Sequence, residues 1–261
     1  MEIAPPFGYR NLKALNRSDH VRYSATDALP PFVKETAIVP LSIGEMVSAA
    51  CHYPLVFVGD VKNNRAVLVA MLGLVAGENL FLTGKGWRAG AYLPAYVRRY
   101  PFCMAHITVN EQADPNLVVC VEKDYVMAEA DEGSRRLFDD TNKATVEWQS
   151  IEAFLMEYEA DLERTNAFCS RLVDLDLLEP LTVNITQPNK ASCNVTGFLG
   201  INEGKLAKLA DDTILEWYCN GWLARAYLHL FSLQRLQCLL QVREEQRVQH
   251  AASETIAEQS G

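Results

Sequence analysis

The sequence predicts an α+β fold. We expect an N-terminal mixed or antiparallel β-sheet of about six strands, then a long amphipathic helix, a β-hairpin and a C-terminal helix pair. Short apolar runs rich in β-branched residues alternate with turn residues over residues 36–121, as in a sheet. Apolar residues recur every three or four positions over residues 146–174, as in an amphipathic helix. A second pair of strand-like runs and two further helical segments follow.

The domain organisation is predicted from composition along the chain. Residues 1–33 are rich in proline and polar side chains, so we expect an N-terminal arm laid over the body. Residues 34–261 are expected to form a single α+β domain, because no repeat or low-complexity block divides them. The polar, acidic segment at residues 125–145 is the one candidate for a boundary within that domain.

Strands dominate the prediction for the first half. The predicted strands are residues 36–41, 55–58, 66–72, 79–82, 105–109 and 117–121. Two asparagines at residues 63–64 fit a turn that joins the second and third strands as a hairpin. Ser42, followed three residues later by Glu45, predicts the start of a helix over residues 43–52.

The second half is predicted to place helices around one hairpin. Residues 181–186 and 192–201 are strand-like, and a turn of Gln, Pro, Asn and Lys joins them. We then expect a helix over residues 213–220 and another over residues 222–247. Gly221 between them fits a left-handed helix stop.

Composition and charge argue against several classes of protein. A nucleic-acid-binding protein needs clustered Lys and Arg, whereas this chain has a net charge of −9. Its apolar runs are all shorter than the roughly 20 residues of a membrane span, and the N-terminus lacks the pattern of a secretory signal peptide. The seven cysteines are scattered without a C-x-x-C pair, which favours reduced thiols in a cytoplasmic protein over disulfides or a zinc site.

Motifs of several common enzyme classes are missing. The five histidines do not cluster, and the sequence contains neither a G-x-S-x-G elbow nor a G-x-G-x-x-G fingerprint. The Gly-Lys pair at residues 84–85 lacks the phosphate-loop pattern, because Asn79 and Gly86 occupy the positions of the required Gly and Ser or Thr. We expect a hairpin turn there. The sequence therefore indicates no metal site, and it leaves the cofactor and the catalytic residues unknown.

The densest cluster of aromatic, Arg, Gly and Pro residues lies within residues 77–102. Rings and guanidinium groups can stack or bind anions, while Gly and Pro fix the backbone that carries them. At residues 96–100 at least one Arg stands beside a Tyr ring in either an extended or a helical conformation, which suits a carboxylate or phosphate. We therefore expect a ligand-binding site formed by Trp87, Tyr92, Tyr96, Arg98, Arg99, Tyr100, Glu78 and Asn79. Alternatively, the arginines pair with acids such as Glu78 or Asp60 and the rings simply pack.

Seven segments between residues 54 and 222 carry a family resemblance that spans roughly residues 9–240. They are Pro54-x-Val56-Phe57, Gly77-Glu78-Asn79-Leu80-Phe81, Trp87-Arg88-Ala89-Gly90, Leu93-Pro94-Ala95-Tyr96-Val97-Arg98-Arg99-Tyr100-Pro101-Phe102, Arg164-Thr165-x-Ala167-Phe168-Cys169, Leu175-Asp176-Leu177-Leu178-Glu179-Pro180 and Asn220-Gly221-Trp222. In order and spacing they resemble the bacterial SapC family. The resemblance implies an association with surface-layer proteins. It also implies a functional link to TonB-dependent receptors and flavin-dependent tryptophan halogenases, and it carries over no catalytic residue.

Three functions remain open. The first is a cytoplasmic binding or accessory protein that holds a peptide or small anionic ligand against Arg98, Arg99, Tyr96 and Trp87. The second is an enzyme that modifies a peptide or amino-acid derivative. An enzyme should bring a titratable group such as His106, Glu78 or Cys103 into the pocket with the arginines, whereas a pocket of aromatic, Arg and backbone groups favours binding. The third is a surface-layer or export component.

Overall fold

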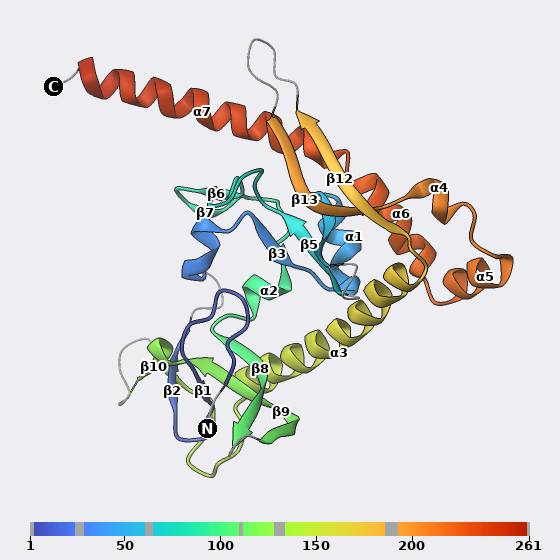
Figure 1. The fold of residues 1–261 in the computed structure, drawn as a ribbon. Helices are drawn as coiled ribbons and strands as arrows, with labels where there is room; N and C mark the ends of the chain where they lie inside the picture. The colour runs from blue at the N-terminus through green and yellow to red at the C-terminus, as the bar shows by residue number, and fades with distance from the viewer. Residues whose placement is uncertain are drawn as a thin grey trace. The chain divides into compact units, whose positions relative to one another are not determined.

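The computed structural model describes residues 3–23, 29–60, 65–109, 112–127, 134–185 and 193–259 (Figure 1). The chain divides into two compact units. Unit 1 consists of Met1–Lys34 and Ala95–Glu163, and unit 2 consists of Glu35–Pro94 and Arg164–Gly261. The predicted turns at residues 63–64 and 187–190 lie outside the described residues. The predicted arm at residues 1–33 and the boundary at residues 125–145 stay predictions.

Unit 1 contains two small antiparallel sheets, with strand orders β1–β9–β8 and β10–β2–β11. The pairing of β8 with β9 sets Phe102 opposite Val121 and confirms the strands predicted at residues 105–109 and 117–121. A short helix, α2, precedes β8. The bounds are β1 Leu12–Ala14, β2 His20–Arg22, α2 Ala95–Arg98, β8 Phe102–Val109, β9 Gln112–Glu122, β10 Val126–Met127 and β11 Ser134–Arg136.

The core of unit 1 forms where the first half of a long helix meets these strands. This helix, α3, spans Val146–Asp174 as the apolar period predicts, and the two units divide within it. Trp148 and Leu155 are two turns apart and fully buried, together with Val21 and Val121. The ring of Trp148 meets that of Phe102 edge-on at 5.4 Å between centroids. Each such side chain contributes about 1.5–3 kcal/mol when it leaves water.

Unit 2 is built on a five-stranded antiparallel sheet of order β12–β13–β4–β5–β3. The hairpin of β4 and β5 is the one predicted from their β-branched runs. The later hairpin, β12 and β13, joins the same sheet through Leu199 opposite Phe57. The α+β fold class is therefore confirmed, with strands from both halves of the chain in one sheet. The bounds are β3 Ile38–Pro40, β4 Leu55–Asp60, β5 Arg65–Met71, β12 Leu178–Ile185 and β13 Cys193–Ile201.

The helices of unit 2 begin and end largely where the sequence predicts. The Glu45 carboxylate accepts hydrogen bonds from the backbone N–H and hydroxyl of Ser42, at 3.1 and 2.9 Å, at the start of the helical segment that leads into α1. Gly221 has a φ of 79°, the left-handed conformation expected between α5 and α6. Among the described residues no helix has the length and apolar character of a membrane span. The bounds are α1 Met46–Ala50, α4 Glu203–Leu206, α5 Asp211–Cys219, α6 Trp222–Ser232 and α7 Arg235–Gln259.

The helix predicted over residues 222–247 is in fact two helices, α6 and α7. The N–H groups of Leu233 and Gln234 donate to carbonyls three residues back, at 3.3 Å, which tightens the chain into a turn. Ser232 fixes the end of α6, because its hydroxyl donates to His229 O at 2.6 Å and accepts from the N–H of Leu55 in β4 at 3.0 Å. This contact joins residues far apart in the sequence, so the helical period gave no sign of the break.

His229 is a hydrogen-bonded core residue that links two strands of the sheet. Its Nε2 accepts from the Ile201 N–H at 3.0 Å, because an amide can only donate. The ring proton is therefore on Nδ1, which donates to Leu55 O at 2.8 Å. Burial lowers the pKa of His229 from its ordinary 6.5 to about 4, although the bond to Leu55 opposes the shift. The imidazole is therefore neutral at neutral pH.

Candidate functional site

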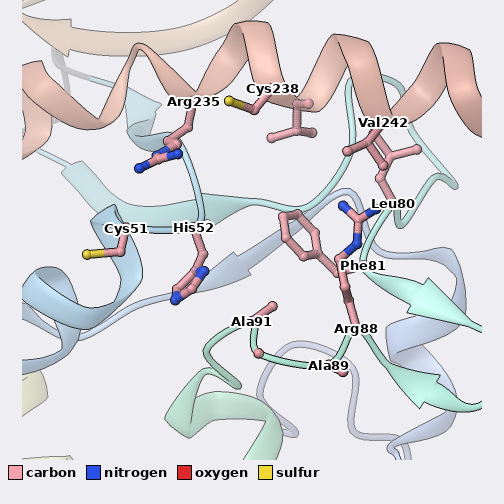
Figure 2. Close-up of a pocket in the computed structure, with 12 residues that line it drawn as sticks. Cys51, His52, Leu80, Phe81, Arg88, Ala89, Ala91, Arg235, Cys238 and Val242 are labelled. Atoms are coloured by element: carbon pink, nitrogen blue, oxygen red, sulfur yellow. The ribbon is translucent and has the colours of Figure 1, made fainter.

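A pocket of about 290 Å³ lies in unit 2 (Figure 2). One wall is the residues after α1, and another is the chain on either side of a small hairpin of β6 (Leu82–Thr83) and β7 (Gly86–Trp87). The third wall is the first turns of α7. The side chains with polar or reactive groups are Cys51, His52, Arg88, Arg235 and Cys238. The others are Leu80, Phe81, Ala89, Gly90, Ala91, Leu239 and Val242. The lining thus carries two guanidinium groups and no carboxylate.

Helix α7 presents one face to the pocket. Arg235, Cys238, Leu239 and Val242 are spaced i, i+3, i+4 and i+7, and such positions share one side of a helix. Leu239 is buried, whereas Arg235 and Cys238 are exposed. The helix is therefore anchored through its apolar side chains and leaves its charged and thiol groups accessible.

The hairpin of β6 (Leu82–Thr83) and β7 (Gly86–Trp87) shapes a second wall, and it confirms the turn expected at residues 83–86. The Arg88 N–H donates to Phe81 O at 2.7 Å, which continues the pairing and sets these two pocket residues side by side. The strand predicted over residues 79–82 is largely wrong, because only Leu82 of these residues lies in a strand. The reason is local: the Phe81 N–H donates instead to the Asn79 side chain at 2.9 Å.

A group of aromatic residues supports the Phe81 ring. The rings of Tyr53 and Trp87 lie 4.5 and 6.1 Å from it between centroids. Trp87 Nε1–H donates to the Tyr53 hydroxyl and to Tyr92 O, both at 3.2 Å, and the Tyr53 hydroxyl donates to the same carbonyl. The Tyr92 hydroxyl donates to Glu45 at 2.9 Å. Trp87 and Tyr92, both predicted as ligand residues, are thus brought together behind the pocket wall.

Glu78 and Asn79, also predicted as ligand residues, hold the loop that leads into the pocket. The Glu78 carboxylate accepts from the Leu74 N–H at 2.8 Å and lies 2.8 Å from Nε of Arg243 on α7. The alternative interpretation of the sequence paired Glu78 with Arg98 or Arg99. In the structure the ion-pair partner of Glu78 is Arg243 instead. Asn79 accepts from the Phe81 N–H.

The other predicted ligand residues belong to unit 1, where Arg99 is buried among aromatic rings. Its guanidinium lies 4.2 Å from the Tyr96 ring centroid and 5.0 Å from that of Tyr158. It forms an ion pair with Glu159 at 3.3 Å, and its side chain is only 3% exposed. Burial raises the pKa of Glu159, and the Arg99 charge opposes this shift. Arg99 is thus paired with an acid and packed on rings, as in the alternative interpretation, although Glu159 was not the acid expected.

The neighbours of Arg99 are placed differently. The Arg98 side chain is exposed, with its guanidinium 5.0 Å from the Phe154 ring centroid. The Tyr96 hydroxyl donates to Phe7 O at 2.6 Å, and the Tyr100 ring lies 5.1 Å from that of Tyr9. Whether these residues bind a ligand stays a prediction.

The charges of the pocket are not neutralised by nearby acids. Within the described part of the chain, neither Arg88 nor Arg235 forms an ion pair, whereas Arg243 and Arg99 each have a carboxylate partner. Arg235 is exposed and Arg88 is half-buried, so an anion can reach both guanidinium groups without first breaking an ion pair. Among the described residues no group of three or more His, Cys, Asp or Glu side chains could hold a metal ion.

Half of the pocket lining comes from residues 77–102, but through different side chains from those predicted. No local sequence pattern marks His52, Cys51, Arg235 and Cys238, because they are far apart in the chain and match no motif. One signal was present: the i, i+3, i+4, i+7 spacing that begins at Arg235. Arg88 follows the predicted residue Trp87 and lies in one of the segments that carry the family resemblance.

Comparison with known proteins identifies the family of this chain. The model of the family described as SapC matches residues 15–239, which is most of the chain. The chain belongs to the SapC family. The SapC match includes every pocket-lining residue except Val242. No curated protein and no solved structure matches the chain.

Proposed function

We propose that this SapC-family chain is a binding or accessory protein that holds a small organic anion in the pocket of unit 2. The observation that carries the proposal is the pairing of two guanidinium groups, Arg88 and Arg235, with a lining that contains no carboxylate. A bound anion supplies the missing negative charge. Hydrogen bonds from Arg to an anionic group typically contribute about 1.5–3 kcal/mol each.

The size and lining of the pocket favour a small ligand. Its volume of about 290 Å³ is near the lower end of the range for small-molecule sites. Leu80, Phe81, Leu239 and Val242 provide apolar surface, so the ligand carries a hydrocarbon part as well as a charge. A peptide fits this proposal only through one acidic end or side chain.

An enzyme is the second candidate, because His52, Cys51 and Cys238 line the same pocket. Nucleophilic catalysis by a thiol needs a base in hydrogen-bond contact with it. In the described residues the Cys51 thiol donates to Val47 O, and the His52 ring has no hydrogen bond to a thiol or carboxylate. This arrangement supports binding over catalysis.

The proposal includes a cytoplasmic location. Each of the six cysteines whose side chain is described is a free thiol, which suits a reducing compartment. The links to TonB-dependent receptors and tryptophan halogenases implied by the family resemblance would make the anion a molecule that is taken up or modified. A surface-layer or export role remains the third candidate.

Isothermal titration with octanoate, compared with neutral octanamide, tests the proposal. We expect octanoate to bind the wild-type protein and octanamide to bind much more weakly. The double variant Arg88→Gln, Arg235→Gln should lose octanoate binding, whereas the matched variant Arg98→Gln, which removes an exposed charge in unit 1, should retain it. If Arg98→Gln loses binding and the double variant keeps it, the site lies in the predicted residues of unit 1 and the proposal is wrong.

A further inference from the structure

The two cationic ends of the pocket lie apart. Figure 2 shows Arg235 and His52 to one side of the Phe81 ring and the Arg88 guanidinium to the other. Arg88 belongs to the chain after β7, whereas Arg235 begins α7. A single carboxylate that contacted both guanidinium groups would have to lie against the apolar Phe81 ring, which offers it no hydrogen bond. Each guanidinium therefore serves its own end of the pocket.

The wall between these ends is apolar. Phe81 is only 7% exposed, so its side chain is held firmly in the body of unit 2. The Phe81 ring cannot swing away without disturbing its contacts with Tyr53 and Trp87. This middle section favours hydrocarbon and offers no partner for a charged group.

Resting on the proposed function, we infer that the ligand is a diacid: two acidic groups joined by an apolar body, one at Arg88 and the other at Arg235 beside His52. A guanidinium presents a planar fork of donors that matches a carboxylate, so each end can bind one group through two hydrogen bonds. The apolar body covers the Phe81 ring. Because no lining residue carries a carboxylate, neither end can pair with an ammonium group, and amino acids and diamines are disfavoured.

The test is a titration series with α,ω-dicarboxylates from succinate to sebacate, run beside octanoate and ω-aminooctanoate. We expect one intermediate chain length to bind best, because the two acidic groups must span the apolar section. Suberate, which has the eight carbons of octanoate, serves as the reference diacid. Suberate should bind at least about tenfold more tightly than octanoate, since it gains a second charge-assisted contact. The ammonium group of ω-aminooctanoate should bring no such gain.

Single-arginine variants show whether both ends are used by one molecule. Arg88→Gln and Arg235→Gln should each reduce suberate affinity to near that of octanoate, while octanoate itself changes little because one end remains. If succinate, suberate and octanoate bind equally, or if only one of the two variants reduces suberate affinity, the diacid inference is overturned while anion binding stands. If no anion binds, the proposed function fails with it. Circular dichroism and thermal melting of each variant without ligand show whether misfolding accounts for a loss of suberate affinity.

Discussion

Nε of Arg243 on α7 lies 2.8 Å from the carboxylate of Glu78, the residue two positions before the pocket wall begins at Leu80. The amide of Gln246, one turn further along α7, donates to Leu80 O at 3.3 Å. These contacts join two of the three segments that form the pocket. Neither Arg243 nor Glu78 lines it, so they act by positioning the wall.

Removal of this ion pair should therefore loosen the pocket. We expect Arg243→Gln to weaken suberate binding several-fold and to lower stability by no more than about 1 kcal/mol, as for partly exposed ion pairs. Titration and chemical denaturation measure the two effects. Arg247→Gln is the matched control, because Arg247 is more exposed and lies 3.9 Å from Glu244. Equal effects of the two variants on binding contradict the positioning role.

Arg99 and Arg98 should differ sharply in their contribution to stability. Arg99→Ala leaves the Glu159 carboxylate partly buried without its partner and removes the cation from between the rings of Tyr96 and Tyr158. We expect the free energy of unfolding to fall by about 3–5 kcal/mol in Arg99→Ala and to change by no more than about 0.5 kcal/mol in the exposed Arg98→Ala. Urea denaturation followed by fluorescence gives both values. Similar stabilities for the two variants contradict the buried-pair description.

His229 should make the stability of unit 2 depend on pH. Its pKa is about 4 in the folded chain and about 6.5 when unfolded, so between these values only the unfolded state binds the proton. The stability contributed by the neutral imidazole is fully present above pH 6.5 and is lost as the pH falls toward 4. A shift of this size corresponds to about 3 kcal/mol. We expect the difference in unfolding free energy between the wild type and His229→Gln to shrink as the pH falls from 6.5 to 4. A difference that stays constant over this range contradicts the lowered pKa of His229.

The thiols offer a test of ligand position that requires no substitution. Cys51, Cys238 and Cys219 are exposed, whereas burial raises the pKa of Cys103 and Cys169 to about 12. Iodoacetamide is neutral, so the pocket arginines do not attract it. We expect suberate to slow alkylation of Cys51 and Cys238 but not of Cys219 on α5, as measured by peptide mass spectrometry. Equal protection of all three thiols, or none, contradicts binding in this pocket.

The sequence predicts well what is decided locally. Helix α3 follows from its apolar period, the β4–β5 hairpin from its β-branched runs, and the break at Gly221 from glycine's access to positive φ. It predicts poorly what depends on distant contacts. Ser232 ends α6 through a bond to Leu55, and the hairpin of β12 and β13 joins β4, neither of which a short window of sequence can show.

The candidate site was likewise predictable only where it depends on local sequence. The prediction found the stretch that supplies half of the pocket lining, because its density of rings, Arg and Gly is a local property. It could not choose between neighbours such as Trp87 and Arg88, since only the pairing of β6 with β7 decides which of them faces the pocket. Nor could it place Arg235 beside His52, because the fold of unit 2 brings α7 and the end of α1 to one pocket.

A crystal structure of the protein grown or soaked with suberate tests the central claim most directly. The account predicts electron density for one molecule in the pocket of unit 2, with one carboxylate at Arg88, the other at Arg235, and the hydrocarbon chain over Phe81. Density for suberate at Arg98, or an empty pocket at ligand concentrations that saturate binding in solution, would contradict it.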